Sequence, residues 1–277
     1  MWKTLGEVPP GELLDARLEA HHAAQWVARA TRAYCQPEPD DSHTTMSWDS
    51  HSQALMGRPL SSDLTVGLHL TDLTIIGQSR QGEESFCLIG QTESSVGTWL
   101  AELVERHNLD PKKLDKPGPY TLDKHPLDSS MAYGSADKKS REELAKYYNN
   151  AAPILEAIRA AYSEASPVRC WPHFFDIATL LTLEQKGTSE KATIGIGLSP
   201  GDATFADPYF YVSLWPYPPK ESLPPVIEPS FWHLEGFTAL IIRASDLVAK
   251  KYVELQQGKV KTIMEQGVKA SMHLLTH

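Results

Sequence analysis

Residues 64–76 read LTVGLHLTDLTII and contain two short apolar runs separated by Thr71-Asp72. The alternation of apolar with polar or small residues is typical of a strand with one buried face. A two-residue connection cannot cross over to a parallel partner, so the two runs predict antiparallel neighbours. Together with a strand over 85–89, the stretch predicts an antiparallel meander. The apolar side of the first strand consists of Leu64, Val66, Leu68 and Leu70.

Helices are predicted before and after this meander in the sequence. Over 11–35, apolar, aromatic or small residues recur about every four positions, which is the spacing of one helical stripe. A second stripe over 94–108 follows the meander. Between the first helix and the meander, 44–55 predicts a strand of mixed polarity. The first half of the chain therefore predicts the order helix, strands, helix.

The second half predicts the same order of elements. A helix over 140–165 contains Pro153, which removes one backbone hydrogen bond and bends the helix. Residues 168–183 are apolar on both faces and predict a central strand. A loop over 216–229 is stiffened by six prolines. Further strands are expected over 192–198, 208–215 and 236–242, and a helix from 245 to about 257 that extends towards 275.

These patterns predict an α+β fold with antiparallel meander sheets and flanking helices. The predicted division is a half over 1–110, a connector over 111–139 that is rich in Pro, Gly, Lys and Asp, and a half over 140–277. The halves are expected to form either two domains or one continuous domain. Their shared order of elements fits an internal duplication, and it fits two unrelated units equally well.

The composition excludes several classes of partner. The chain has 277 residues and a net charge of −9 without a block of Lys or Arg, so it repels nucleic-acid phosphates and anionic membranes. No stretch approaches the length of a membrane span, and the first 22 residues lack the apolar core of a signal peptide. We expect a soluble, cytoplasmic protein. The cysteines Cys35, Cys87 and Cys170 are too scattered for a disulfide framework, and we expect them to be buried or half-buried thiols.

The first candidate site residues lie in 170–176, which read CWPHFFD. A carboxylate in such an apolar run is costly unless it is paired, so Asp176 is the acid that the sequence singles out. Burial and a partner could tune it for proton transfer, or it could only tie down a loop. On a regular strand His173 points away from Asp176, whereas Trp171 and His173 share a face. Asp176 and His173 are the candidate catalytic residues, and Trp171 is a candidate ligand contact.

The second set of candidates lies in 207–217, which read DPYFYVSLWPY. Tyr209, Tyr211 and Trp215 alternate with apolar residues and form an aromatic face with polar tips. Tyrosine and tryptophan need partners for their O–H and N–H groups, so this face is expected to meet a small polar or planar ligand, polar backbone or a subunit interface. Asp207 and Trp232 are further candidate ligand contacts, and His233 and Glu235 could lie at the rim of this face.

Other sequence motifs narrow the chemistry. No histidine pair has the spacing of a strong metal motif, although eleven histidines leave a metal site as a weaker option. His22 lies on the apolar stripe of its helix and is expected to be a hydrogen-bonded core residue. The chain contains no P-loop and no nucleophile elbow, and the glycines of 195–201 lack the dinucleotide-binding spacing. The sequence identifies no cofactor.

The motifs resemble those of an uncharacterised, mainly bacterial family, a domain of unknown function. The similarity rests on Ser166-Pro167-Val168, Trp171, Phe175-Asp176-Ile177-Ala178, and Phe210-Tyr211 through Pro216. Where that family has a histidine before the aromatic pair, this chain has Arg169-Cys170. The resemblance implies a shared fold and no activity.

Two functions remain open from the sequence. In one, the protein binds a small molecule or is an enzyme, with its site on the face of Tyr209, Tyr211 and Trp215 and with Asp176 or His173 as the proton carrier. In the other, it is a non-catalytic interaction module, and the same face contacts a second copy or another partner. A concave site that holds Asp176 and the tyrosines would favour the first, and a flat aromatic surface the second.

Overall fold

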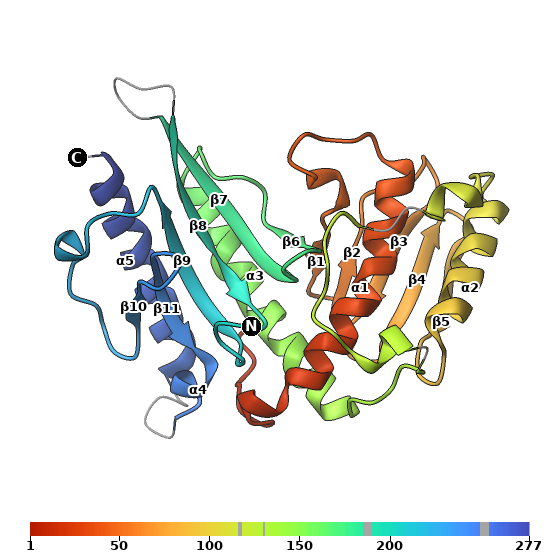
Figure 1. Cartoon of the computed structure of the whole chain (residues 1–277), viewed down its shortest axis with the longest axis horizontal. Coiled ribbons are helices and arrows are strands. Elements are labelled where there is room, and N and C mark those ends of the chain that lie inside the picture. Colours follow the sequence, from red (N-terminus) through yellow and green to blue (C-terminus); the bar gives the residue numbers. More distant parts are fainter. Residues whose placement is uncertain (116–117, 130, 185–189, 250–254, 277) are drawn as a thin grey trace. The chain divides into compact units, whose positions relative to one another are not determined.

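The computed structural model of the chain describes residues 1–277 except 116–117, 130, 185–189, 250–254 and 277 (Figure 1). It confirms the α+β class, with two open antiparallel sheets. The chain divides into two compact units. The first unit contains Glu12–Ala145 and Arg169–Phe175, and the second contains Met1–Gly11, Lys146–Val168 and Asp176–His277.

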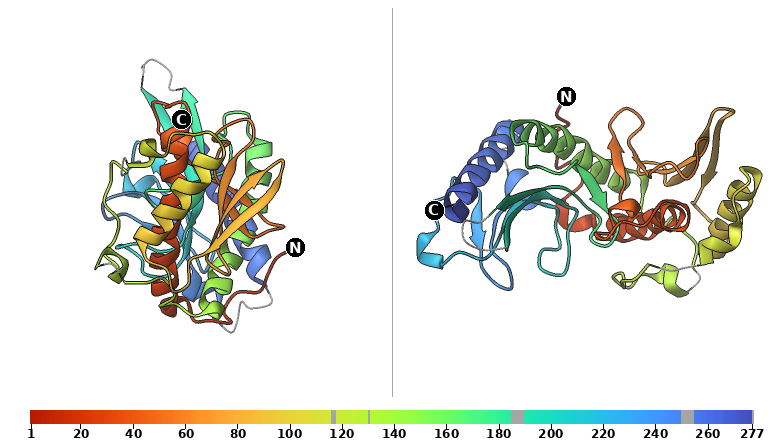
Figure 2. Two further views of the ribbon diagram at one scale, coloured as in Figure 1. Left: turned by 90° about the vertical axis from the view of Figure 1, so that its right-hand side faces the viewer. Right: turned by 90° about the horizontal axis from the view of Figure 1, so that it is seen from above.

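The first unit contains a five-stranded meander in the order β1-β2-β3-β4-β5. The predicted alternation over 64–70 is confirmed, because all four apolar residues of that side are at most 1% exposed. Helices α1 and α2 lie on the same face of this sheet (Figure 2). The elements of this unit are α1 (Leu14–Tyr34), β1 (Ser47–Asp49), β2 (Ala54–Met56), β3 (Thr65–His69), β4 (Thr74–Ser79), β5 (Gly82–Cys87) and α2 (Glu93–Arg106).

The second unit contains a twisted antiparallel sheet with helices on one side. Its strands follow the order β10-β11-β9-β8-β7. Helices α3 and α5 lie together over one face of the sheet (Figure 2). The elements are β7 (Asp176–Glu184), β8 (Lys191–Ser199), β9 (Tyr209–Trp215), β10 (Phe231–His233), β11 (Ala239–Arg243), α4 (Ala244–Leu247) and α5 (Gln256–Thr276), together with the part of α3 (Lys138–Ala161) from Lys146 on.

The alternation of β9 explains how α5 packs on this sheet. Phe210, Val212 and Leu214 are at most 1% exposed, as predicted for the apolar face of the strand. Helix α5 comes close to this face at Gly267, where an added Cβ would lie 2.7 Å from the Leu240 side chain and 3.1 Å from that of Val212. A glycine at this position of α5 therefore sets the distance between helix and sheet.

The predicted central strand over 168–183 is wrong at its beginning. It is divided into β6 (Arg169–Trp171) and β7, with a turn between them. Pro172 has no N–H to donate to a ladder, and the Phe175 N–H donates to the Trp171 carbonyl at 2.7 Å, which closes one helical turn. Phe175 ends the turn with a φ of 58°. The common strand face predicted for Trp171 and His173 therefore does not form.

Three other predictions need correction. The strand over 44–55 is a hairpin, β1 and β2, because Asp49 accepts hydrogen bonds from the His51 N–H and the Ser52 hydroxyl and so stabilises a turn. The strand predicted over 236–242 begins only at Ala239, and the short β10 before it was not predicted. Cys87 is exposed because it ends β5, an edge strand, whereas Cys170 is buried and Cys35 half-buried.

Other outcomes concern the C-terminal helix and the division into halves. The predicted helix over 245–257 corresponds to α4 and the start of α5, and part of it, 250–254, lies outside the described residues. The predicted division at a connector over 111–139 stays a prediction, because compact units of a chain are not by themselves independently folding domains. The internal duplication also stays a prediction.

Two glycines of α5 provide a matched test of the packing against the sheet. Relative to Gly258→Ala, Gly267→Ala is expected to lower the free energy of unfolding by about 1–3 kcal/mol, because the methyl group overpacks the contact with Leu240 and Val212. Gly258→Ala adds a methyl group with nothing within 4 Å and is expected to stabilise the protein by about 0.5–1 kcal/mol. Urea unfolding of both variants checks this, and equal effects would contradict the packing.

Candidate functional site

The candidate site lies on the face of the second unit's sheet opposite the one that packs on α5. We call it the tyrosine face and define it by Asp176 on β7, Gly195 and Gly197 on β8, and Tyr209, Tyr211, Ser213 and Trp215 on β9. The strand register places these residues on one side, since Gly197 pairs with both Ala178 and Tyr211, and Gly195 pairs with Ser213. The polar-tipped side of β9, which the period of this strand alone predicted, is therefore observed.

The glycines of β8 let side chains of β9 lie across that strand. A Cβ on Gly197 would be 2.6 Å from the Tyr211 hydroxyl oxygen, and one on Gly195 would be 2.6 Å from the Ser213 Oγ. Because these positions lack side chains, the Tyr211 ring reaches over β8 to β7. Its hydroxyl donates to the Asp176 Oδ2 at 2.5 Å.

Of the acids at this face, Asp176 has the least favourable environment for a charged carboxylate. It is 8% exposed, and its Oδ1 is buried without a hydrogen-bond partner among the described residues. Burial raises the pKa of Asp176 to about 6, the hydrogen bond from Tyr211 opposes the rise, and the charge of Asp202 adds to it. Burial and the neighbouring Asp176 carboxylate raise the pKa of Tyr211 well above its ordinary value. The proton of the pair therefore stays on Tyr211, and Asp176 titrates close to neutral pH.

A second Tyr–Asp pair adjoins the first. The Tyr209 hydroxyl donates to the Asp202 Oδ2 at 2.5 Å, and the Tyr209 and Tyr211 ring centroids are 6.1 Å apart. The other oxygen of Asp202 accepts the N–H groups of Thr204 and Phe205, at 2.7 and 2.9 Å. Asp202 was not predicted. Its place after Gly201 indicates a turn, but no sequence signal indicates that the turn directs it at Tyr209.

An aromatic cluster borders the Tyr209 end of the face. The His233 ring lies 5.2 Å from that of Phe205 and 4.5 Å from that of Phe237. The His233 Nε2 is 2.8 Å from the Glu235 carbonyl oxygen. His233 therefore lies near the tyrosines through Phe205, which itself packs on Tyr209 at 5.1 Å.

Two other predicted contact residues, Trp232 and Asp207, form hydrogen bonds outside the two Tyr–Asp pairs. Trp232 precedes His233 on β10, so the two side chains point to opposite faces of the sheet. On the face opposite the tyrosine face, Trp232 lines a cavity of about 180 Å³ with Leu240 and residues of α5. Its indole N–H donates to the Pro224 carbonyl at 2.9 Å. Asp207 accepts the Ser245 N–H at 3.4 Å, at the start of α4.

Trp171 and His173 belong to the first unit. The His173 ring lies 5.8 Å from the rings of both Trp171 and Tyr120. Burial lowers the pKa of His173. In the same unit, the His21 ring stacks on Phe175 at 5.0 Å, and burial lowers the pKa of His21 to about 4. His173 and Asp176 are thus separated by the turn at 172–175 into different units.

The remaining histidine predictions concern the core and metals. His22 is 7% exposed, and its Nε2 is 3.2 Å from the Asp123 carbonyl oxygen, so the prediction of a hydrogen-bonded core histidine is confirmed. Within the described parts of the chain, no three His, Cys, Asp or Glu side chains are grouped so that they could hold a metal ion. No helix in those parts is long and apolar enough to cross a membrane.

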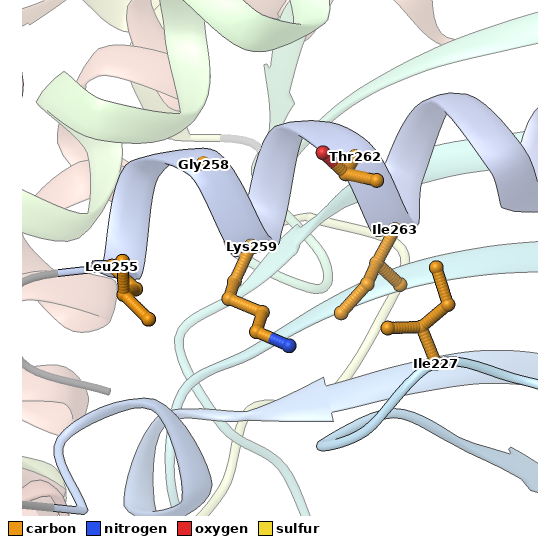
Figure 3. A pocket seen from close by; sticks show the side chains of 6 residues that line it. All are labelled: Ile227, Leu255, Gly258, Lys259, Thr262 and Ile263. Atoms are coloured by element: carbon orange, nitrogen blue, oxygen red, sulfur yellow. The ribbon is translucent and has the colours of Figure 1, made fainter. Parts of the chain in front are cut away.

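Two cavities of the second unit lie away from the tyrosine face. One of about 370 Å³ lies between the proline-rich loop and α5, where the Ile263 side chain points towards that of Ile227 (Figure 3). The Lys259 ammonium group donates to the Glu228 carbonyl at 3.0 Å. Neither this cavity nor the one beside Trp232 is lined by Asp176, Tyr209 or Tyr211.

The chain matches no family model, and neither the curated proteins nor the solved structures contain a significant match.

The raised pKa of Asp176 predicts a pH-dependent stability. A carboxyl whose pKa rises from 3.8 to about 6 on folding contributes stability below about pH 4, and this is lost as the pH rises through 6. Asp176→Asn cannot ionise. Relative to the wild type, the variant is expected to gain about 2 kcal/mol between about pH 4.5 and pH 7.5. Urea unfolding at both pH values measures this difference.

The control for this prediction is Glu221→Gln, which removes an exposed carboxylate of the same unit. Its stability difference from the wild type is expected to be nearly the same at both pH values. If Asp176→Asn behaves like this control, burial does not raise the pKa of Asp176.

Proposed function

We propose that the protein binds a small polar molecule at the tyrosine face, with Asp176 as the group that grips it. The observation that carries the proposal is the asymmetry of the Asp176 carboxylate, whose Oδ2 is paired with Tyr211 and whose buried Oδ1 has no partner among the described residues. A buried, unpaired carboxylate oxygen is costly. Oδ1 is covered in the structure, so a ligand that donates a hydrogen bond to it would remove that cost once the covering side chains move aside.

The electrostatics of the face support a donor or cationic ligand. Two carboxylates, Asp176 and Asp202, adjoin two tyrosines, and each tyrosine hydroxyl is already committed to a carboxylate. The acceptor capacity that remains is on Asp176. With a pKa of about 6, this side chain is largely ionised at pH 7.5 and can exchange a proton with a bound molecule. We assign it the role of proton carrier should the bound molecule be a substrate.

The surface around the pair suits a planar ligand. Trp215 is 55% and Leu180 41% exposed, and Tyr211 is half-buried. An exposed indole and aliphatic side chain beside a polar group provide apolar contact together with a directional hydrogen bond.

We also propose that the chain belongs with the uncharacterised bacterial family whose short motifs it shares, and that it acts in the cytoplasm. Asp176 and Tyr211, which form the buried pair, both lie within those motifs. The shared motifs therefore coincide with the proposed site.

A thermal-shift screen of small polar metabolites at about pH 7.5 tests the site. A ligand at about 100 times its Kd is expected to add about 2.7 kcal/mol to the stability of the wild type. This stabilisation should disappear in Asp176→Asn and weaken in Tyr211→Phe, which removes the hydroxyl and keeps the ring. Glu221→Gln, on an exposed residue, should keep it. A screen without hits, or hits that survive Asp176→Asn unchanged, would show that this site is wrong.

A second candidate function is an interaction module that uses the end of the same strand. Trp215 and Tyr217 are 55% and 48% exposed, and their rings meet edge to face at 5.0 Å. Exposed aromatic side chains of this kind anchor protein interfaces, so a second copy of the chain is the partner that we propose for this surface.

The oligomeric state decides this second candidate. If the wild type dimerises through these rings, Trp215→Ala with Tyr217→Ala is expected to weaken the dimer by about tenfold or more. Light scattering across a dilution series measures the change. The matched control is Leu234→Ala, which truncates an exposed apolar side chain elsewhere in this unit. A wild type that is monomeric at every concentration excludes the module as a homodimer.

A further inference from the structure

The first residues of the chain lie against two buried side-chain amides of the second unit. The Asn150 Oδ1 accepts the Lys3 N–H at 2.8 Å, and its Nδ2 donates to the Lys3 carbonyl at 2.7 Å. The Gln256 Oε1 accepts the Leu5 N–H at 2.9 Å, and its Nε2 donates to the Leu5 carbonyl at 3.0 Å. Each amide therefore pairs with both backbone groups of one residue, as a neighbouring strand would.

The spacing of these contacts fits a peptide recognised by its backbone. Lys3 and Leu5 are two residues apart, so their backbone groups point the same way along an extended chain. Asn150, on α3, is fully buried, and Gln256, the first residue of α5, is 2% exposed. Such side chains are seldom buried without a fixed partner, and here the partner is the peptide backbone.

Two side chains of the segment add sequence specificity. Leu5 is 2% exposed, and the Trp2 indole N–H donates to the Gln256 Oε1 at 3.3 Å. A cavity of about 190 Å³ beside Trp2 is lined by Asn150 and by residues of α3 and α5. The side chains of Lys3 and Thr4 are exposed. The recognised pattern is therefore an aromatic residue, two exposed residues and an aliphatic residue. Peptide-binding grooves likewise combine hydrogen bonds to the backbone with pockets for particular side chains.

The segment is connected to this unit only through a long stretch of chain. Met1–Gly11, which we call the arm, belongs to the second unit, whereas the chain from Glu12 on belongs to the first. Lys3 and Asn150 are 147 positions apart in the sequence. A contact between such distant segments has no local constraint that reserves it for one molecule. The same element from an identical chain makes the same bonds.

We propose that the surface around Asn150 and Gln256 is a peptide-binding groove that takes the arm of a second copy as well as the arm of its own chain. Within one molecule, the connection keeps the arm at a high effective concentration, so the closed monomer prevails in dilute solution. At high protein concentration, or when its own arm is weakened, the groove binds an arm in trans. This groove uses none of the residues of the tyrosine face.

Mixing two complementary variants tests the exchange. The groove variant carries Asn150→Leu with Gln256→Leu, so its arm is intact and its groove cannot bond a backbone. The arm variant carries Trp2→Ala with Leu5→Ala, so its groove is intact and its arm lacks both anchors. Each variant alone is expected to be monomeric. An equimolar mixture at about 50 µM, roughly a typical Kd for a short peptide, should form a one-to-one heterodimer by light scattering. A mixture that stays monomeric would overturn the exchange.

Binding of a synthetic peptide of residues 1–8, MWKTLGEV, tests the groove independently of the groove variant. Labelled at its C-terminus, it is expected to bind the arm variant and to raise its Tm. N-methylation of the Lys3 and Leu5 nitrogens should weaken binding at least about tenfold, because both N–H donors to the amides are lost. The control peptide with Lys3→Ala changes only an exposed side chain and should bind as the parent does.

Two outcomes of the peptide experiment contradict the proposal. One is an arm variant with a native circular dichroism spectrum that does not bind the peptide. The other is equal binding of the N-methylated and parent peptides, because the backbone pairing would then contribute nothing. If the arm variant is only partly folded, the rise in its Tm with added peptide is the readout, and the absence of a rise overturns the proposal.

Discussion

The hydrogen bond between Tyr211 and Asp176 joins two strands that are not neighbours. Tyr211 lies on β9 and Asp176 on β7, and the strand between them, β8, leaves room because it carries Gly197. A side chain at that position would fill the space that the tyrosine hydroxyl occupies. The position of the Tyr211 ring and its hydrogen bond to the buried carboxylate both depend on this one gap in the side chains of the sheet.

The turn at 172–175 gives this carboxylate its environment. If the strand had continued from Trp171, Asp176 would have lain in the middle of one long strand. Pro172 and the left-handed Phe175 instead end β6, and Asp176 becomes the first residue of β7. The Asp176 carboxylate is paired with Tyr211, which lies two strands away.

Several buried polar side chains of the second unit are hydrogen-bonded to polypeptide backbone. Asn150 and Gln256 are buried, yet each forms two bonds to a backbone residue of the arm. Asp202 likewise binds two backbone N–H groups with one oxygen and Tyr209 with the other. In each case, the charge or dipole is satisfied by groups from a distant or turning part of the chain. Asp176 differs, because one of its oxygens lacks such a partner among the described residues.

The sequence by itself determined the α+β class, the meander over 64–76, the main helices and the two faces of β9, because periodicity records which side of an element is buried. It also singled out Asp176, because a carboxylate in an apolar run is costly wherever it lies. It could not indicate Asp202, Asn150 or Gln256, whose partners lie across turns or distant segments. Nor could it show that Gly197 brings Tyr211 to Asp176 or that His173 lies in the other unit. Only the tertiary structure decided those pairings, because hydrogen bonds depend on the positions of atoms in space, and local sequence patterns fix positions only within one element.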